Sequence, residues 1–266
     1  MNTRSAAFFD LDKTIIARSS TLAFSKPFFE GGLLSRRAVL RSAYAQFMFS
    51  INGADHDQVE RMRAYLTQMV AGWDVDVVRQ SVRETLHSII DPIVFDEAVE
   101  LIEQHQAAGR DVVIVSASGS EVVEPIGEML GVDHVIATTL VARDGRYTGE
   151  VDFYAYGPKK AEAMETLAAE RGYDLSESYA YSDSETDAPM LAAVGHPFAV
   201  NPDKALRRIC DENGWPILTF ARPVALRRRV GLDTRVGKAA AVAVVAGAVS
   251  AITVALVTRR KHRLVA

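Results

Sequence analysis

Short apolar segments alternate with segments of helical periodicity along most of this 266-residue chain, and this alternation constrains the fold more than any other feature. The apolar segments have the length and the composition of buried strands. They lie at residues 6–9, 111–118, 134–138, 178–181 and 196–201. Between them, apolar residues recur three and four positions apart, as they do on one face of a helix. The pattern predicts an α/β fold with a parallel sheet and helices on both faces.

Three local patterns add detail to this prediction. Residues 18–90 contain several helical stretches, so we expect a mostly helical insertion after the first strand. A further helix is predicted to start near Pro92 and to stop at Gly109, and another to have Pro158 near its first turn. The dipeptide Asp144-Gly145 is typical of a tight β-hairpin turn.

Composition and charge limit the class of protein. Hydrophobic residues make up 48% and charged residues 24% of the chain, which indicates a globular protein. The net charge of −4 gives no reason to expect nucleic acid as a partner. Cys210 is the only cysteine, so no disulfide can form within the chain and a reducing compartment is favoured. Acids follow the start of the chain too closely for an apolar signal segment.

Polar residues gather where the predicted strands end. Asp10 and Asp12 follow the first strand, and Ser-Ala-Ser-Gly at 116–119 closes the second. Ser-Asp-Ser-Glu-Thr-Asp at 182–187 follows a later strand, and Lys159 and Lys160 open the helix before it. Parallel sheets bind ligands at the carboxyl ends of their strands, which is where these residues are expected to meet. Carboxylates, hydroxyls, N–H groups and an ammonium suit a divalent cation and a phosphoryl group.

Each of these groups also has an ordinary structural explanation when it is taken alone. A serine that ends a strand is usually a cap, and acids are favoured at the start of a helix. Two adjacent lysines are often a solvated helix face. The order and the spacing of the groups therefore carry the interpretation.

In this order, the groups resemble the four motifs of the haloacid dehalogenase superfamily of phosphohydrolases, and most closely its phosphoserine-phosphatase-like branch. The motifs are DxDxT, an apolar strand that ends in Ser or Thr, a lysine, and an acidic DxxxD. They are matched in turn by Asp10, Asp12 and Thr14; by Ser116; by Lys160 or, less well, Lys159; and by Asp183 and Asp187. The resemblance extends to about residue 220. It implies a Rossmann-like α/β core, formed by residues 1–17 and 91–220, and a helical cap at 18–90.

The resemblance also implies a role for each matched residue. Asp10 is expected to attack phosphorus and to become an aspartyl phosphate, and Asp12 to act as general acid and then as general base. Lys160 is expected to neutralise the nucleophile and the phosphoryl group. Ser116, Ala117 and nearby N–H groups are expected to hold phosphate oxygens.

A magnesium ion completes the site that the resemblance implies. Mg²⁺ is expected to lie between Asp10, the backbone carbonyl of Asp12 and Asp183, with Asp187 in support. The function implied is therefore an Mg²⁺-dependent phosphatase that hydrolyses a small phosphorylated metabolite beneath the cap.

Two departures concern the substrate. Phosphoserine phosphatases have a Glu nine residues after the nucleophile, where this chain has Ser19, and Ser-Gly-Gly where this chain has Ser-Ala-Ser at 116–118. Phosphoserine itself is therefore not implied. A phosphotransferase or phosphomutase is an alternative function, and so is a non-catalytic membrane-anchored scaffold. An ion pump is disfavoured, since its DKTGT motif needs Gly where this chain has Ile15.

The C-terminal part has a different composition from the rest. Residues 239–257 are 19 uncharged residues, which as a helix span about 28 Å, close to the thickness of a hydrocarbon core. A basic linker at 221–238 precedes them and a basic tail at 258–266 follows. We expect a transmembrane helix that anchors the protein at the cytoplasmic face of the cell membrane, with a buried or an interfacial helix as the alternatives. Small residues at every fourth position from 239 to 255 suit a homodimer, although Ala-rich segments also give such stripes by chance.

Overall fold

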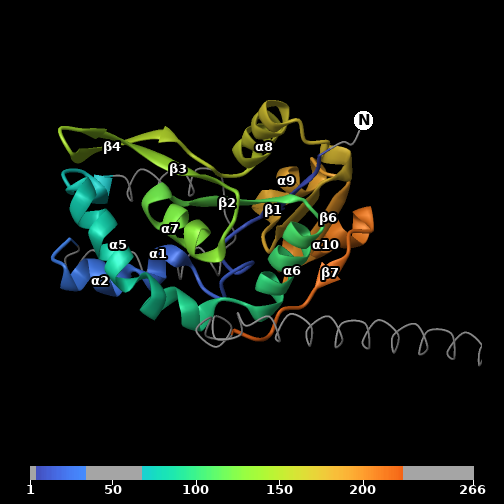
Figure 1. Ribbon diagram of the computed structural model, residues 1–266, viewed down its shortest axis with the longest axis horizontal. Coiled ribbons are helices and arrows are strands. Elements are labelled where there is room, and N and C mark those ends of the chain that lie inside the picture. The colour runs from blue at the N-terminus through green and yellow to red at the C-terminus, as the bar shows by residue number, and fades with distance from the viewer. Residues whose placement is uncertain (1–3, 34–67, 224–266) are drawn as a thin grey trace, which may run out of the picture. The chain divides into compact units, whose positions relative to one another are not determined.

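The computed structural model describes residues 4–33 and 68–223 (Figure 1). Within them, one sheet has the strand order β4-β3-β2-β1-β5-β6-β7. The strands are β1 (Ala6–Phe9), β2 (Asp111–Gly119), β3 (His134–Arg143), β4 (Arg146–Phe153), β5 (Tyr179–Ser182), β6 (His196–Val200) and β7 (Ile217–Leu218). Neighbouring strands are parallel except β3 and β4, which are antiparallel. The predicted α/β fold with a parallel sheet is confirmed.

Strand β1 lies in the middle of the sheet, because its four apolar residues can be buried on both faces. It pairs with β2 on one side and with β5 on the other, so that Phe9 lies opposite Ile114 and Tyr181. The Asp10 N–H donates to the carbonyl of Tyr181 at 2.9 Å, which continues the pairing one residue beyond the strand. The backbone of Asp10 is thereby fixed at the carboxyl edge of the sheet.

Helices cover both faces of the sheet and give three layers (Figure 1). They are α6 (Asp96–Ala107), α7 (Ser120–Leu130), α8 (Pro158–Arg171), α9 (Ala188–Ala192) and α10 (Lys204–Asn213), with short 3₁₀ turns η1 (Asp91–Ile93), η2 (Leu175–Glu177) and η3 (Glu185–Asp187). Helices α8, α9 and α10 share one buried core with Phe8 of β1. Helices α6 and α7 pack against the other face, where an added Cβ at Gly127 would lie 2.7 Å from a methyl group of Val135.

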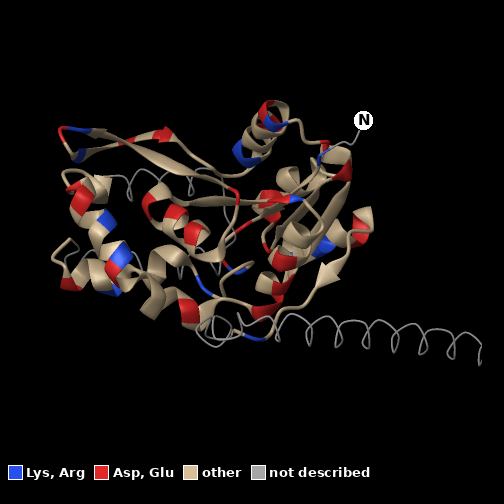
Figure 2. Ribbon diagram, viewed as in Figure 1, with Lys and Arg blue, Asp and Glu red and all other residues tan. Residues whose placement is uncertain are grey.

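The β3–β4 hairpin turns at Asp144 and Gly145, whose φ angles are +50° and +75°. A two-residue hairpin turn with positive φ at both central residues is favoured, because the twist of such a turn matches the twist of the flanking strands. Asp tolerates this conformation and Gly adopts it readily, so the predicted turn is confirmed. The turn end of the hairpin carries both basic and acidic side chains (Figure 2).

The described part of the predicted insertion is helical. It contains α1 (Ser20–Ala23), α2 (Ser25–Glu30) and α5 (Val75–Ile90). Asp74 caps the start of α5, since its carboxylate accepts hydrogen bonds from the N–H groups of Asp76 and Val77. Two further stretches of this insertion are predicted as helical: 47–50 lies outside the described residues, and so does all of 59–70 except residues 68–70, which are helical. The boundaries of the cap at 18–90 stay a prediction.

The segment before α5 is hydrogen-bonded to the β3–β4 hairpin. The Gly72 N–H donates to the carbonyl of Tyr147 at 2.7 Å, and the Tyr147 N–H donates to the carbonyl of Trp73 at 3.0 Å. The Arg146 guanidinium also donates to the carbonyl of Gly72 at 2.9 Å. The helical region is therefore attached to the core sheet through the hairpin as well as through its own two chain connections.

The prediction that a helix starts near Pro92 is wrong about the position of its start. The chain forms η1 and then becomes extended at Val94, with φ −70° and ψ 132°, before α6 begins at Asp96. The reason is a pair of backbone hydrogen bonds between the two connections: Phe95 N–H donates to Ile15 O at 2.9 Å, and Ala17 N–H donates to Ile93 O at 2.7 Å. A helix through Val94 would lose both.

The last described residues pack beside the segment that leads into α6. Phe95 forms a backbone bridge with Pro223, and the Asp96 N–H donates to the carbonyl of Arg222 at 2.9 Å. Among residues 4–33 and 68–223, no helix has both the length and the apolar character needed to cross a membrane. The predicted transmembrane helix at 239–257 lies outside the described residues, as do its basic tail and most of its linker.

Candidate active site

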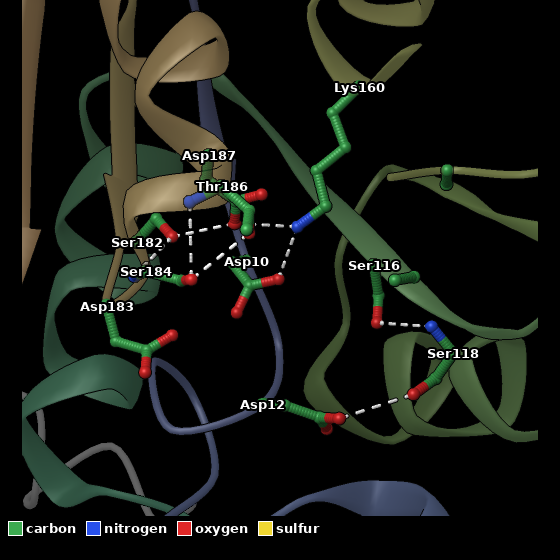
Figure 3. Close-up of polar contacts among 12 residues, drawn as sticks. Asp10, Asp12, Ser116, Ser118, Lys160, Ser182, Asp183, Ser184, Thr186 and Asp187 are labelled. Carbon is green, nitrogen blue, oxygen red and sulfur yellow. Dashed lines mark hydrogen bonds and ion pairs between the residues drawn. The ribbon is translucent and has the colours of Figure 1, made fainter. Parts of the chain in front are cut away.

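Asp10, Lys160 and Asp187 meet at the carboxyl ends of β1 and β5 (Figure 3). The Lys160 ammonium donates to Asp10 Oδ1 at 2.6 Å and to Asp187 Oδ2 at 2.7 Å. All three side chains are almost completely buried. Asp10 comes directly after β1, Asp187 ends η3, and Lys160 lies in the first turn of α8. A buried lysine between two carboxylates is a charged unit that the fold brings together from distant parts of the sequence.

The two adjacent lysines of the predicted third motif have different surroundings. Lys160 is 2% exposed and points into the site. Lys159 is exposed and pairs with Glu162 one helical turn later. Side chains of neighbouring helical residues point about 100° apart, so only one of the two can enter the site. The geometry therefore selects Lys160.

The acidic loop after β5 adds a third carboxylate. Asp183 lies beside Asp10 and is 7% exposed (Figure 3). Its nearest cationic partner is the exposed Lys13, whose ammonium is 3.7 Å from Asp183 Oδ2. Ser182 at the end of β5 donates to Asp187 Oδ2 at 2.7 Å. Ser182 and Lys160 thus hold one oxygen of Asp187, while Asp183 has no close cation besides Lys13 among the ion pairs of the described residues.

Ser116 lies near the end of β2, on the other side of Asp10. Its hydroxyl accepts a hydrogen bond from the Ser118 N–H at 3.2 Å and keeps its own proton to donate. The register of β2 against β3 shifts between Ser116 and Gly119. The carbonyl of Ala117 is bound at 2.7 Å by the Thr138 hydroxyl. Ser116 is 1% exposed, and it is placed to donate to an anion beside Asp10.

Asp12 lies two residues beyond Asp10 and is held from two elements. Its Oδ1 accepts the backbone N–H of Ser20 at 2.8 Å, and its Oδ2 accepts the hydroxyl of Ser118 at 3.3 Å. The hydroxyls of Ser20 and Ser118 are 2.7 Å apart. The two oxygens of Asp12 are therefore both engaged, one by α1 and one by β2.

The electrostatics of the site show an excess of buried negative charge. Burial raises the pKa of Asp10 well above its ordinary value, Asp187 and Asp183 raise it further, and Lys160 opposes them. Burial raises the pKa of Asp183 to about 7. Burial alone would lower the pKa of Lys160, but the charges of Asp10 and Asp187 raise it above its ordinary value. One ammonium does not balance three carboxylates, so the site favours a further cation.

The fit of a metal ion follows from this charge and from the donor atoms. Among the described residues, no three His, Cys, Asp or Glu side chains stand close enough to hold a metal alone. Mg²⁺ does not need three, because it usually binds one or two carboxylates and completes its shell with waters and phosphate oxygens. Asp10 accepts from Lys160 through Oδ1 and lies beside Asp183, so the two carboxylates offer oxygen ligands, while Asp187 Oδ2 accepts from both Lys160 and Ser182. The residues therefore fit Mg²⁺, with Asp187 in a supporting position.

The structure thus brings together most of the residues singled out from the sequence. Asp10, Asp183, Asp187 and Lys160 form one cluster, and Asp12 lies next to it with residues 116–118. Lys159 is not part of the site. Sequence reasoning missed Ser20, because no local pattern shows that a residue at the start of α1 meets one 98 positions later. A buried carboxylate beside an ammonium, a hydroxyl and further carboxylates suits phosphoryl or acyl chemistry.

Comparison with known proteins identifies the class. Residues 7–192 match the family model of haloacid dehalogenase-like hydrolases. The chain belongs to this family, and the match covers all four motifs.

Curated relatives extend over nearly the whole chain. An "Inhibition of morphological differentiation protein" of Streptomyces azureus is 63% identical over 98% of this chain and 94% of its own length. A probable phosphatase of Mycobacterium tuberculosis is 59% identical over 96% of this chain and 90% of its own length. A phosphoserine phosphatase of the same species is 33% identical over 97% of this chain and 82% of its own length. Of solved structures, a Bordetella pertussis protein of unknown function has a TM-score of 0.72 and 30% identity, and covers 82% of this chain and 99% of its own.

Proposed function

We propose that this protein is a phosphatase that hydrolyses a small phosphomonoester through an aspartyl phosphate on Asp10. Family membership and the relatives named as phosphatases support a phosphoric monoester hydrolase. The observation that carries the mechanism is the Asp10 carboxylate, buried at the sheet edge with Lys160 at 2.6 Å and Ser116 and Asp183 nearby.

In the first step, a carboxylate oxygen of Asp10 attacks phosphorus and the bond from phosphorus to the ester oxygen breaks. The departing oxygen takes a proton from the Asp12 carboxyl, so that the alcohol leaves neutral. Burial raises the pKa of Asp12, and hydrogen bonds from Ser20 and Ser118 oppose the rise. Asp12 is thus placed to hold a proton more readily than an exposed Asp.

In the second step, the ionised Asp12 accepts a proton from a water molecule as that water attacks phosphorus. The bond between phosphorus and the Asp10 oxygen breaks, and phosphate and the Asp10 carboxylate are released. Lys160 holds Asp10 in place and offsets its charge, while Ser116 and the N–H groups near Ala117 donate to the phosphoryl oxygens. Bound Mg²⁺, held by Asp10, the carbonyl of Asp12 and Asp183 with Asp187 in support, would supply positive charge to the phosphoryl oxygens.

The substrate class is a small phosphorylated metabolite. Helices α1 and α5 belong to the predicted cap, and a cap over the site favours small esters. One relative is named a phosphoserine phosphatase, but this chain has Ser19 where a Glu is expected to meet the substrate amine. We therefore leave the alcohol part of the substrate open and propose only a phosphomonoester.

A phosphotransferase or phosphomutase would share the first step and differ in the acceptor of the second. A non-catalytic scaffold would release no phosphate. Phosphate release from a panel of phosphorylated metabolites separates the three, since a transferase turns over only when an acceptor alcohol is added. The same panel identifies the preferred substrate.

The decisive variant is Asp10→Asn, which keeps the size of the side chain but removes the nucleophilic oxygen. We expect phosphate release to fall by at least about a thousandfold, because no covalent intermediate can form. Mixing the protein with excess chelator should stop turnover as well. Full activity of Asp10→Asn or of the chelated protein contradicts the mechanism.

We also propose that the protein is attached to the cytoplasmic face of the membrane through residues 239–257, with a homodimer as a secondary possibility. The support is the uncharged run of 19 residues between two basic segments. Chemistry at the site does not depend on this attachment, because every residue of the mechanism lies before residue 188.

A further inference from the structure

We propose that Ser118, with Ser20, is a positioning residue that holds the Asp12 carboxyl group in its working orientation during both steps of the reaction. The inference rests on the proposed function, since it needs Asp12 to transfer protons. The inference is specific to this chain, because residue 118 is Ser, whereas phosphoserine phosphatases tend to have Gly at that position.

The contacts around Asp12 leave its carboxyl little freedom to rotate. Ser20 donates its backbone N–H to Oδ1 at 2.8 Å, and Ser118 approaches Oδ2 at 3.3 Å with its hydroxyl. The Ser118 hydroxyl is itself held by the Ser20 hydroxyl at 2.7 Å. Ser20 is fully buried and Ser118 is 8% exposed, so water competes little for these bonds. Removing the Ser118 hydroxyl would free one side of the carboxyl.

The end of β2 explains how Ser118 reaches Asp12. The pairing of β2 with β3 is regular up to Ser116 and resumes only at Gly119, so residues 117 and 118 are extra in β2. Such a bulge bends a strand and re-aims its side chains. The Thr138 hydroxyl donates to the carbonyl of Ala117, and the Ser116 hydroxyl accepts from the N–H of Ser118, which satisfies two of the backbone groups that the bulge releases. The bulge is therefore a stable feature that turns Ser118 toward Asp12.

A pair of hydroxyls is suited to a group that alternates between acid and base. Each hydroxyl has one proton to donate and two lone pairs to accept with, and its proton rotates to suit its neighbours. Ser118 can donate to the ionised Asp12 and can also accept from the protonated one. The same two contacts can therefore persist while Asp12 gives up its proton and takes one from water. A lysine at residue 118 could not serve both forms in this way, because its ammonium can only donate.

The test compares two substrates that differ in their need for a proton donor. An alkyl phosphomonoester from the panel has a poor leaving oxygen that requires protonation, whereas 4-nitrophenyl phosphate has a good one that leaves as the anion. Ser118→Ala should lower kcat/KM for the alkyl ester about tenfold and change kcat/KM for 4-nitrophenyl phosphate by less than about twofold, because kcat/KM reports only the steps up to loss of the leaving oxygen. The second step is common to both substrates, so any fall in kcat that comes from slower water attack should be the same for both. Ser20→Ala should show the same selectivity with a smaller loss, since the Ser20 backbone bond to Asp12 remains.

Two further variants exclude a merely structural effect. Ser118→Thr keeps the hydroxyl and should recover most of the alkyl-ester activity. Ser88→Ala removes an exposed hydroxyl from α5, remote in sequence from the motifs, and should change neither substrate. An equal loss of kcat/KM on both substrates, or no loss for Ser118→Ala, overturns the positioning role. Activity that survives Asp10→Asn overturns the proposed function itself, so the two failures are distinguishable.

Discussion

Lys160 is the buried cation on which the charge balance between Asp10 and Asp187 depends. Its ammonium lies within 2.7 Å of an oxygen of each of two buried carboxylates, Asp10 and Asp187. Removing one partner of such a buried set leaves uncompensated charge, which costs far more than the loss of an exposed ion pair. The position therefore matters both for Asp10 and for the local fold.

Lys160→Met should lower kcat/KM by at least about a hundredfold, because the phosphoryl group loses a cation and Asp10 loses the group that orients it. The matched control is Lys159→Met, which removes an exposed ion pair with Glu162 and should retain activity within about twofold. Steady-state phosphate release from the two purified proteins measures both. A larger loss in Lys159→Met would contradict the assignment of the catalytic lysine.

His105 is a buried residue outside the site whose protonation is opposed by its neighbours. The Arg110 guanidinium donates to His105 Nδ1 at 2.7 Å, so this nitrogen must accept and Nε2 carries the proton toward the Tyr181 hydroxyl at 2.9 Å. Burial, and then the charge of Arg110, lower the pKa of His105 to about 4. The imidazole is therefore neutral in the fold.

This neutral His105 predicts a loss of stability in mild acid. Below about pH 6.5 the unfolded chain binds a proton at His105 that the folded chain refuses, so the free energy of unfolding falls as pH drops toward 4. Between pH 7 and pH 4.5 this residue accounts for roughly 2.5 kcal/mol. Denaturant unfolding of His105→Gln should show a fall that is smaller by about that amount. His87→Gln is the control at an exposed histidine, and an equal fall in both variants refutes the prediction.

Among the elements, the turn into β6 depends on a close approach between two backbones. The Gly195 N–H donates to the carbonyl of Leu175 at 2.9 Å, and a Cβ added at Gly195 would lie 1.7 Å from the carbonyl oxygen of Ser176. Backbone atoms cannot move aside as a flexible side chain can. The connection between η2 and β6 therefore requires glycine at this position.

Gly195→Ala should destabilise the protein by about 3 kcal/mol, at the upper end of the cost of overpacking. Gly119→Ala is the control for stability, because an added Cβ there meets only a side-chain oxygen of Glu121 at 3.5 Å. It should change the free energy of unfolding by less than about 1 kcal/mol. Chemical denaturation measures the free energy of unfolding of both variants. Equal free energies would show that the backbone near Ser176 moves aside, and would contradict the prediction.

The elements also show what the sequence could and could not reveal. The alternation of strand and helix predicted the parallel sheet, and the strand ends predicted which residues would meet, because both depend on local patterns. The break before α6 depends on hydrogen bonds from Phe95 to Ile15, and the bulge after Ser116 depends on Thr138. Contacts of that kind join distant segments and leave no periodic trace. The same reason kept Ser20 out of the sequence-based site.

For the molecule as a whole, the membrane proposal predicts a difference between two lengths of the chain. Full-length protein should sediment with membranes and need detergent for release, whereas a chain that ends at residue 236 should remain in the supernatant. Both should hydrolyse the same substrate at similar rates, since the residues of the mechanism all precede residue 188. Equal release of the two forms without detergent would contradict the attachment.

The two edge strands of the described sheet, β4 and β7, affect whether folded molecules can associate through the edges of their sheets. Strand β7 has only two residues and follows Pro216, which has no N–H to offer. Strand β4 pairs irregularly with β3, contains Gly149 at a φ of +87°, and exposes charged residues such as Arg146 and Glu150 (Figure 2). Edge strands that are short, irregular or charged are poor templates for pairing with a strand of another molecule. Polymerisation by strand addition is therefore disfavoured at both edges of the described sheet.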